Sequence, residues 1–190
     1  MSESLLSAVL DACVIFQATL RDNLLRAAEL GLFEIRWSDE ILDEAIRNLI
    51  KNGTISTTQA QRLLMAMRQA FPEATVKGFE SLIPHLTNDE KDRHVLAAAV
   101  VARADIIVTS NLKDFPEQAL APFQIEAMSP DQFLIVLFRQ YPETMIEIVI
   151  QQAAALRNPP KTVAEVLDEL ALSAPQFVVL VRSWFNTYQR

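Results

Sequence analysis

The sequence predicts an α/β fold in which helices cover both faces of a central parallel sheet. Along residues 1–138, short apolar runs typical of buried strands alternate with longer stretches in which apolar residues recur at helical spacing. Strands that alternate with helices pair in parallel, because each helix returns the chain to the same edge of the sheet. Residues 139–190 contain helical stretches alone, so we expect an all-helical C-terminal extension.

The expected strands are short runs of apolar or alternating residues. The run at 105–109 (DIIVT) is mostly apolar, as in a parallel strand that is buried on both faces. The run at 33–37 alternates apolar with polar side chains, whereas residues 74–79 give a weak signal. In all, we expect strands at residues 7–10, 33–37, 74–79, 105–109 and 123–128.

The expected helices are bounded by capping residues and by helix breakers. Gly31 is placed to end the first amphipathic stretch, and Ser38, Ser56 and Ser129 can each cap the helix that follows. In the extension, Thr162 with Glu165 forms a capping box. We expect helices up to Gly31, at 38–51, 56–70 and 89–102, from 129 onward, and between breaks at 141–142, 158–160 and 174–175.

Composition limits the classes of function. The 190 residues are 51% hydrophobic, which is enough for a real core, and only 3 glycines are present, so we expect no glycine-rich phosphate loop. The single cysteine, Cys13, excludes a disulfide within the chain and fits a reducing compartment. We find no membrane span or signal peptide and expect a soluble, cytoplasmic protein.

The net charge of −7 argues against nucleic-acid binding, which depends on neutralising phosphates. A site that binds a divalent metal must itself be acidic, however, and the bound ion reverses the local sign of charge. Net charge alone therefore does not exclude a nucleic-acid substrate.

Several polar side chains follow expected strands, at the edge where open parallel sheets bind ligands. Asp11 comes directly after the first strand, and Asn111 and Asp114 follow the strand at 105–109. Asp92 continues the apolar stripe of the expected helix at 89–102, near the N-terminus of that helix. A metal site explains these positions, and so do helix capping by Asp11 and stabilisation of Asp92 by the helix dipole.

The helix at 38–51 offers three further carboxylates, Glu40, Asp43 and Glu44. None lies at the centre of the apolar face, so periodicity does not choose among them. A solvated acidic first turn explains them equally well.

Four stretches in this order give the chain a resemblance to PIN-domain ribonucleases, the fold of many toxins in bacterial type II toxin–antitoxin pairs (VapC-like). The stretches are VLDACV at 9–14, SDEILDE at 38–44, DEKDRHVLAAA at 89–99 and IVTSNLKDFP at 107–116. The resemblance covers roughly residues 5–138. It implies a three-layer α/β/α nuclease domain at 1–138 and an endoribonuclease that depends on Mg²⁺ or Mn²⁺.

The resemblance also implies site residues. Asp11, Glu44 and Asp92 become the principal catalytic, metal-holding carboxylates, which selects Glu44 within its helix. The fourth acidic position of the family falls at Asn111, and Asp114 is expected to supply the missing carboxylate. The loss of a carboxylate at Asn111 affects the expected binding of a second metal ion more than that of the first. Hard divalent ions take oxygen ligands, so the residue types suit this chemistry.

Supporting roles follow for nearby residues. Thr109 and Asn111 are expected to orient a ligand or a water molecule. We expect His94 to contact RNA or solvent rather than metal, and Cys13 to be a core residue. Cys13 and His94 are not expected to act as a nucleophile and its base, because no third group that would orient the base is apparent. The basic residues expected to contact RNA are Lys91, Arg93 and Lys113.

The C-terminal extension carries more apolar residues than one helix face requires. Packing against the rest of the chain explains them, and so do a homodimer or the docking of an antitoxin peptide helix. Two other functions stay open. One is a catalytically weak or inactive module that binds RNA or a protein, favoured by Asn111; the other is a DNA or flap nuclease.

Overall fold

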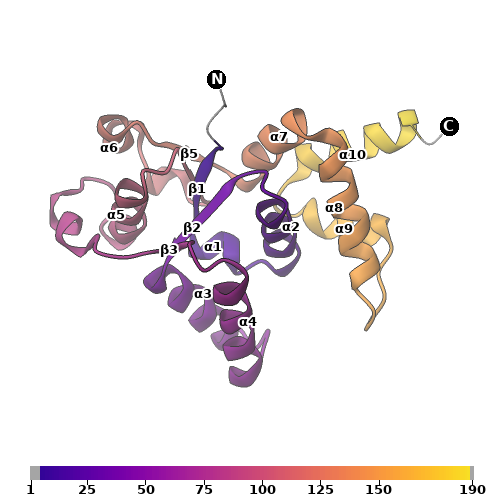
Figure 1. The fold of residues 1–190 in the computed structure, drawn as a ribbon, viewed down its shortest axis with the longest axis horizontal. Coiled ribbons are helices and arrows are strands. Elements are labelled where there is room, and N and C mark those ends of the chain that lie inside the picture. The colour runs from indigo at the N-terminus through magenta and orange to yellow at the C-terminus, as the bar shows by residue number, and fades with distance from the viewer. Residues whose placement is uncertain (1–4, 189–190) are drawn as a thin grey trace.

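The computed structural model describes residues 5–188, and in this part of the chain five parallel strands form one sheet in the order β3-β2-β1-β4-β5 (Figure 1). The α/β class, the parallel pairing and all five expected strand positions are confirmed. The strands are β1 (Ser7–Leu10), β2 (Glu34–Ser38), β3 (Thr75–Val76), β4 (Ile106–Val108) and β5 (Glu126–Met128).

Three strands are shorter than expected: β4 lacks one residue at each end of the run at 105–109, and the other two are shortened by local turns. β3 contains two residues, and Gly78, with a φ of 77°, turns the chain soon after it. The strand expected at 123–128 begins only at Glu126, because residues 121–123 form a 3₁₀ turn and Gln124 adopts a left-handed conformation with a φ of 59°.

The capping residues act as predicted. Ser38 accepts a hydrogen bond from the backbone N–H of Ile41, and complete capping boxes begin at Ser56, Ser129 and Thr162. The helices of the first part are α1 (Ala12–Ile15), α2 (Ala18–Glu29), α3 (Asp39–Lys51), α4 (Thr57–Ala70), α5 (Arg93–Ala102) and α6 (Glu117–Leu120). Those that follow are α7 (Pro130–Gln140), α8 (Pro142–Ala155), α9 (Val163–Leu170) and α10 (Pro175–Tyr188). Short 3₁₀ turns are η1 (Glu80–His85), η2 (Glu90–Asp92), η3 (Leu112–Asp114) and η4 (Ala121–Phe123).

The helix expected at 89–102 starts later than predicted. Asp89 accepts a hydrogen bond from the backbone N–H of Lys91, which closes η2, and α5 begins only at Arg93. Asp92 therefore precedes the apolar stripe of α5 instead of lying on it. It occupies the N-cap position of α5, yet its carboxylate makes no capping hydrogen bond. That carboxylate is free for other interactions.

The sheet lies between two layers of helices. Figure 1 shows α5 on one side of the sheet and α2 and α7 on the other, which is the predicted three-layer arrangement. Leu10 and Val108 are fully buried in the middle strands, and Phe33 packs edge-on against Phe133 of α7 at a centroid distance of 5.0 Å. A rigid, buried sheet thus carries the loops at its carboxyl edge.

The helical extension packs on α2 and shares one core with the sheet domain (Figure 1). Inside this contact, Gln152 of α8 accepts a hydrogen bond from Asn23 at 3.1 Å and donates one to the carbonyl oxygen of Thr19 at 2.8 Å. The Thr19 hydroxyl donates to Glu169 of α9 at 2.6 Å. The boundary predicted between residues 138 and 139 falls inside α7.

Most apolar residues of the extension pack against this shared core, whereas Leu172 and Val179 are exposed. Among residues 5–188, no helix is both long and apolar enough to cross a membrane.

The two hydrogen bonds of buried Gln152 join the extension to α2, so losing them should destabilise the folded protein. Gln152→Ala leaves Asn23 and the Thr19 carbonyl without their partner in a site where Gln152 is 2% exposed, and we expect a loss of about 1–3 kcal/mol in unfolding free energy. Gln151→Ala, at the exposed neighbouring position, is the matched control and should change the value by less than about 0.5 kcal/mol. Urea denaturation followed by circular dichroism measures both. Equal midpoints for the two variants would contradict the expectation.

Candidate functional site

Parallel pairing of β1 with β4 brings Asp11 and Thr109 together at the carboxyl edge of the sheet. Leu10 pairs with Val108, so the next residue of each strand emerges at the same level. The Thr109 hydroxyl donates to Asp11 Oδ2 at 2.6 Å, and the backbone N–H of Ala12 donates to Asp11 Oδ1 at 2.6 Å. Asp11 is 4% exposed and caps α1. Capping and placement at the site therefore hold together, and both oxygens have fixed directions.

Asp92 lies close to three other carboxylates. The pKa of Asp92 is raised from 3.8 to about 6, first by burial and then by the charges of Asp11, Asp114 and Asp89, in that order, while His94 opposes these effects. The loops that carry these residues are joined by a hydrogen bond from the Asp89 N–H to the Asp114 carbonyl oxygen at 3.2 Å. Residues predicted from separate motifs thus share one electrostatic environment.

Within residues 5–188, none of these four carboxylates forms an ion pair with a lysine or an arginine. Their mutual repulsion is left without a strong internal counter-charge. Such a group is stabilised by a cation from outside the chain.

Glu44 lies on α3 and contacts His94, but it is not among the charges that act on Asp92. Its side chain is 41% exposed, and Oε2 lies 3.7 Å from Nε2 of His94 on α5. Glu40 and Asp43 are exposed and make no such contact. Among the three carboxylates that periodicity left undecided, Glu44 is therefore the one directed at α5.

The prediction that His94 contacts RNA or solvent is wrong. The residue is only 7% exposed, and its ring lies against η2, with Nδ1 2.8 Å from the Lys91 carbonyl oxygen. No local signal distinguishes this burial from exposure, since the flanking residues are basic.

Cys13 is half-buried at the rim of the site, and the core placement that we expected is only partly met. Its thiol donates to Asp11 Oδ2 at 3.2 Å and lies 3.6 Å from the Thr109 hydroxyl. Burial, with the nearby Asp11 charge, raises the pKa of this thiol to about 11. It stays protonated near pH 7, which argues against a role as nucleophile. Sequence reasoning missed its contact with Asp11.

The remaining predicted residues are close to Asp92 or Asp114 in the sequence. Asn111 is exposed, and its backbone N–H donates to the Thr109 hydroxyl at 3.0 Å, which fixes that hydroxyl toward Asp11. Lys91 and Lys113 are exposed, whereas half-buried Arg93 donates from Nε to the Asn88 carbonyl oxygen at 3.3 Å. The two lysines are thus the freer basic groups.

The donor set has the chemistry that Mg²⁺ or Mn²⁺ requires, because its members offer carboxylate oxygens. In the described part of the chain, no three His, Cys, Asp or Glu side chains are already arranged to hold a metal ion. Binding would therefore require side chains such as Glu44 to turn toward Asp11 and Asp92.

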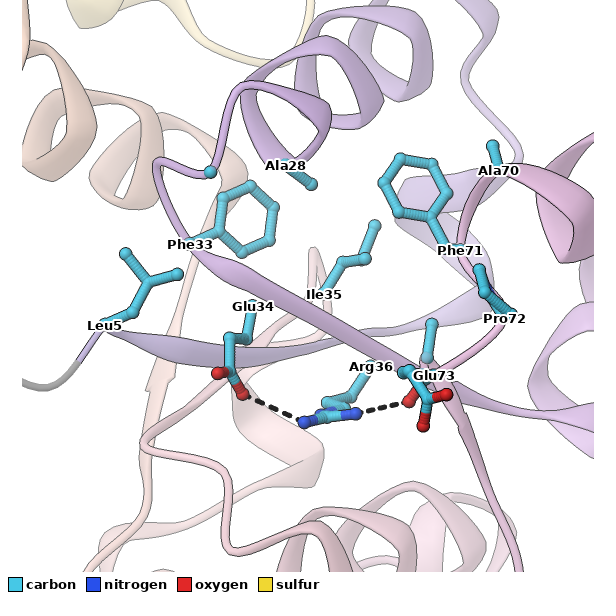
Figure 2. A pocket seen from close by; sticks show the side chains of 12 residues that line it. Leu5, Ala28, Phe33, Glu34, Ile35, Arg36, Ala70, Phe71, Pro72 and Glu73 are labelled. Atoms are coloured by element: carbon cyan, nitrogen blue, oxygen red, sulfur yellow. Dashed lines mark hydrogen bonds and ion pairs between the residues drawn. The ribbon is translucent and has the colours of Figure 1, made fainter.

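A cavity of about 490 Å³ lies elsewhere, along the first half of β2 (Figure 2). Phe33, Ile35 and Phe71 line it. The Arg36 guanidinium donates hydrogen bonds to the Glu34 carboxylate, at 2.9 Å, and to the carbonyl oxygen of Glu73. None of the predicted site residues lines this cavity.

Comparison with known proteins identifies two matching families. A family model described as "PIN domain" matches residues 7–113, and one described as "VapC50 C-terminal domain" matches residues 130–183. A curated protein of Mycobacterium tuberculosis (strain ATCC 25618 / H37Rv), named "Putative ribonuclease VapC50", is 44% identical over 108 residues. The match covers 57% of this chain and 64% of that protein, which is less than two thirds of its length. No solved structure matches the chain.

The crowding around Asp92 predicts a stability that depends on its charge. Its pKa in the folded protein is raised, so the stabilising contribution of the protonated carboxyl is present below pH 3.8 and is lost as the pH rises through about 6. Asp92→Asn removes the repulsion, and at pH 7.5 in EDTA we expect a gain of about 1 kcal/mol in unfolding free energy, already reduced for solvent screening.

The matched control is Glu90→Gln, at an exposed position of the same turn, with an expected change below about 0.5 kcal/mol. Urea denaturation at pH 7.5 and at pH 5 measures both variants. A destabilised Asp92→Asn at pH 7.5 would contradict the account of crowded charges.

Proposed function

Because the chain belongs to the PIN-domain family, we propose that it is a metal-dependent endoribonuclease of the toxin type, which cleaves phosphodiester bonds in RNA. The relative named as a ribonuclease supports the substrate class. The observation that carries the proposal is the convergence of Asp11, Asp92 and Asp114, without a basic ion-pair partner in the described chain, at the carboxyl edge of the sheet.

We propose that Asp11, Glu44, Asp92 and Asp114 hold Mg²⁺ or Mn²⁺. When bound, such an ion lowers the pKa of a bound water and stabilises the leaving oxygen. The protein's own part is to fix the carboxylates. Thr109 and the Ala12 N–H hold Asp11 in one orientation, and Asn111 holds the Thr109 hydroxyl. Asp92, with no capping bond to break, is free to turn toward a ligand.

Substrate contact falls to the nearby basic residues. Exposed Lys91 and Lys113 are suited to bind phosphates on either side of the scissile bond, and Arg93 adds a donor that its contact with Asn88 already orients. These charges would offset the overall charge of −7 where RNA approaches.

A second candidate is a catalytically weak or inactive module that binds RNA or a protein. Two observations favour it: Asn111 stands at an acidic position of the family, and no three described side chains are prearranged around a metal. The two candidates differ in whether RNA is cut.

For partners, we propose an antitoxin protein, and a homodimer as an alternative use of the extension. Exposed Leu172 and Val179 support a contact there. Light scattering that gave a species of 21.4 kDa alone would contradict the homodimer. The lone cysteine fits a cytoplasmic location.

Cleavage is the primary test of the function. We expect the purified chain to cut single-stranded RNA with Mg²⁺ or Mn²⁺, and EDTA to abolish the reaction. Asp11→Asn and Asp92→Asn should each lower kcat at least about a hundredfold, since each removes charge that holds the ion. Glu147→Gln, an exposed carboxylate on α8, is the matched control.

Gel analysis of labelled RNA, with DNA of the same sequence in parallel, measures the rates. If both aspartate variants cut at the wild-type rate, the site assignment is wrong. Cleavage of DNA alone would favour the alternative nuclease.

The proposed phosphate contacts predict a salt-dependent affinity. Lys91→Ala and Lys113→Ala should each weaken RNA binding and reduce the slope of log affinity against log salt by about 0.7, as expected for one lost phosphate contact on a single strand. Arg139→Ala, at an exposed position on α7, serves as the control. Fluorescence anisotropy in EDTA measures binding without cleavage. Slopes equal to that of the wild type would remove both lysines from the binding surface.

A further inference from the structure

The outer strand β5 leaves one residue with unused backbone hydrogen-bonding groups. β5 is last in the sheet order, so β4 alone pairs with it in the described chain. The Glu126 N–H donates to the Asp105 carbonyl oxygen at 3.0 Å. The Met128 carbonyl oxygen accepts from the Thr109 N–H at 2.9 Å. Backbone groups alternate in direction along a strand, so those of Ala127, between these two residues, point away from β4. In the described part of the chain, neither the N–H nor the carbonyl oxygen of Ala127 makes a hydrogen bond.

A cavity of about 470 Å³ opens along this edge of β5. Its size falls in the range of about 300–1,000 Å³ that is typical of ligand pockets. Part of its wall is apolar, because Phe115, Leu120 and Ile125 line it and are buried. Leu112, at the start of η3, also lines the cavity and is 39% exposed. Apolar side chains beside unpaired backbone groups are the arrangement to which an extended peptide adds as a further strand.

The charged part of the cavity wall is acidic. Glu117 and Glu126 line it and are exposed, and no lysine or arginine is among the lining residues. Within residues 5–188, neither carboxylate forms an ion pair. A strand with basic side chains would complement this charge, whereas the phosphates of RNA would be repelled by it.

The same charge disfavours a second copy of this chain as the occupant. Pairing between two β5 edges would bring Glu117 and Glu126 of both copies together, with no basic lining residue from either cavity to separate them. Like charges that face each other across an interface weaken association. The net charge of −7 adds a long-range repulsion between copies. A basic segment of a different protein meets neither repulsion.

We propose that the β5 edge binds an extended peptide segment of a partner protein, in which apolar and basic residues alternate. Backbone groups of the segment bond to the N–H and the carbonyl oxygen of Ala127. Because side chains alternate between the two faces of a strand, the apolar ones pack on Leu112 and Ile125 and the basic ones meet Glu126. No residue assigned to the candidate metal site lines this cavity, so the proposal holds whether or not the chain cuts RNA.

The probe is a seven-residue peptide of alternating valine and lysine, with blocked ends and a fluorescent label. Fluorescence anisotropy at low ionic strength measures its binding to the full-length protein. Ala127→Pro removes the N–H that faces the edge, and we expect it to weaken binding at least about fivefold. Glu126→Lys should weaken binding about tenfold and should instead bind a peptide of alternating valine and glutamate. Glu147→Lys, at an exposed position on α8, is the matched control and should bind as the wild type does.

Amide hydrogen exchange tests the backbone contact without a substitution. In ¹⁵N-labelled full-length protein, saturating valine–lysine peptide should slow the exchange of the Ala127 N–H at least about tenfold, because that group becomes hydrogen-bonded. Urea denaturation checks that Ala127→Pro remains folded.

Several results would overturn the proposal. Absence of binding at millimolar peptide, or equal affinity of the wild type for the valine–lysine and valine–glutamate peptides, would show that the edge does not select a basic segment. An unchanged exchange rate of the Ala127 N–H at saturating peptide would show that no strand is added to β5. A dimer in light scattering that Ala127→Pro converts to a monomer would make a second copy the occupant of this edge.

Discussion

The parallel pairing of β1 with β4 is the constraint on which the candidate site depends. It sets Leu10 beside Val108, and the residues that follow, Asp11 and Thr109, meet at the carboxyl edge with a hydrogen bond of 2.6 Å. The backbone geometry of a parallel sheet fixes this meeting, so it does not rely on flexible side chains. The other acidic residues are arranged around this pair by the loops before α5 and after β4.

The same arrangement brings a cost in stability. Asp92 is drawn into a partly buried position beside other carboxylates, and its pKa rises to about 6 as a result. A protein tolerates such repulsion where the rest of the fold is stable enough and where the charge serves a ligand. Here the buried sheet and the shared core with the helical extension supply the stability. The extension is therefore part of the folded unit that supports the site, through contacts such as that of Gln152 with α2.

Much of the fold could be predicted because its signals are local. Apolar runs located all five strands of the described chain, and Ser38, Ser129 and Thr162 located helix starts through their own capping bonds. The features that were missed depend on tertiary contacts. The burial of His94 reflects how α3 packs near α5, and the start of α5 at Arg93 reflects a turn closed by Asp89. The choice of Glu44 came from family resemblance, since a helical period treats Glu40, Asp43 and Glu44 alike, and it stays a prediction; the structure adds only that Glu44 lies 3.7 Å from His94.

The central claim is that carboxylates from distant segments share one divalent cation. A crystal of the full-length protein soaked in Mn²⁺ tests it most directly, through the anomalous scattering of the ion. The account predicts a peak within coordination distance of both the Asp11 and the Asp92 carboxylates. Manganese peaks confined to other surfaces, with this edge of the sheet free of metal at saturating concentration, would contradict it.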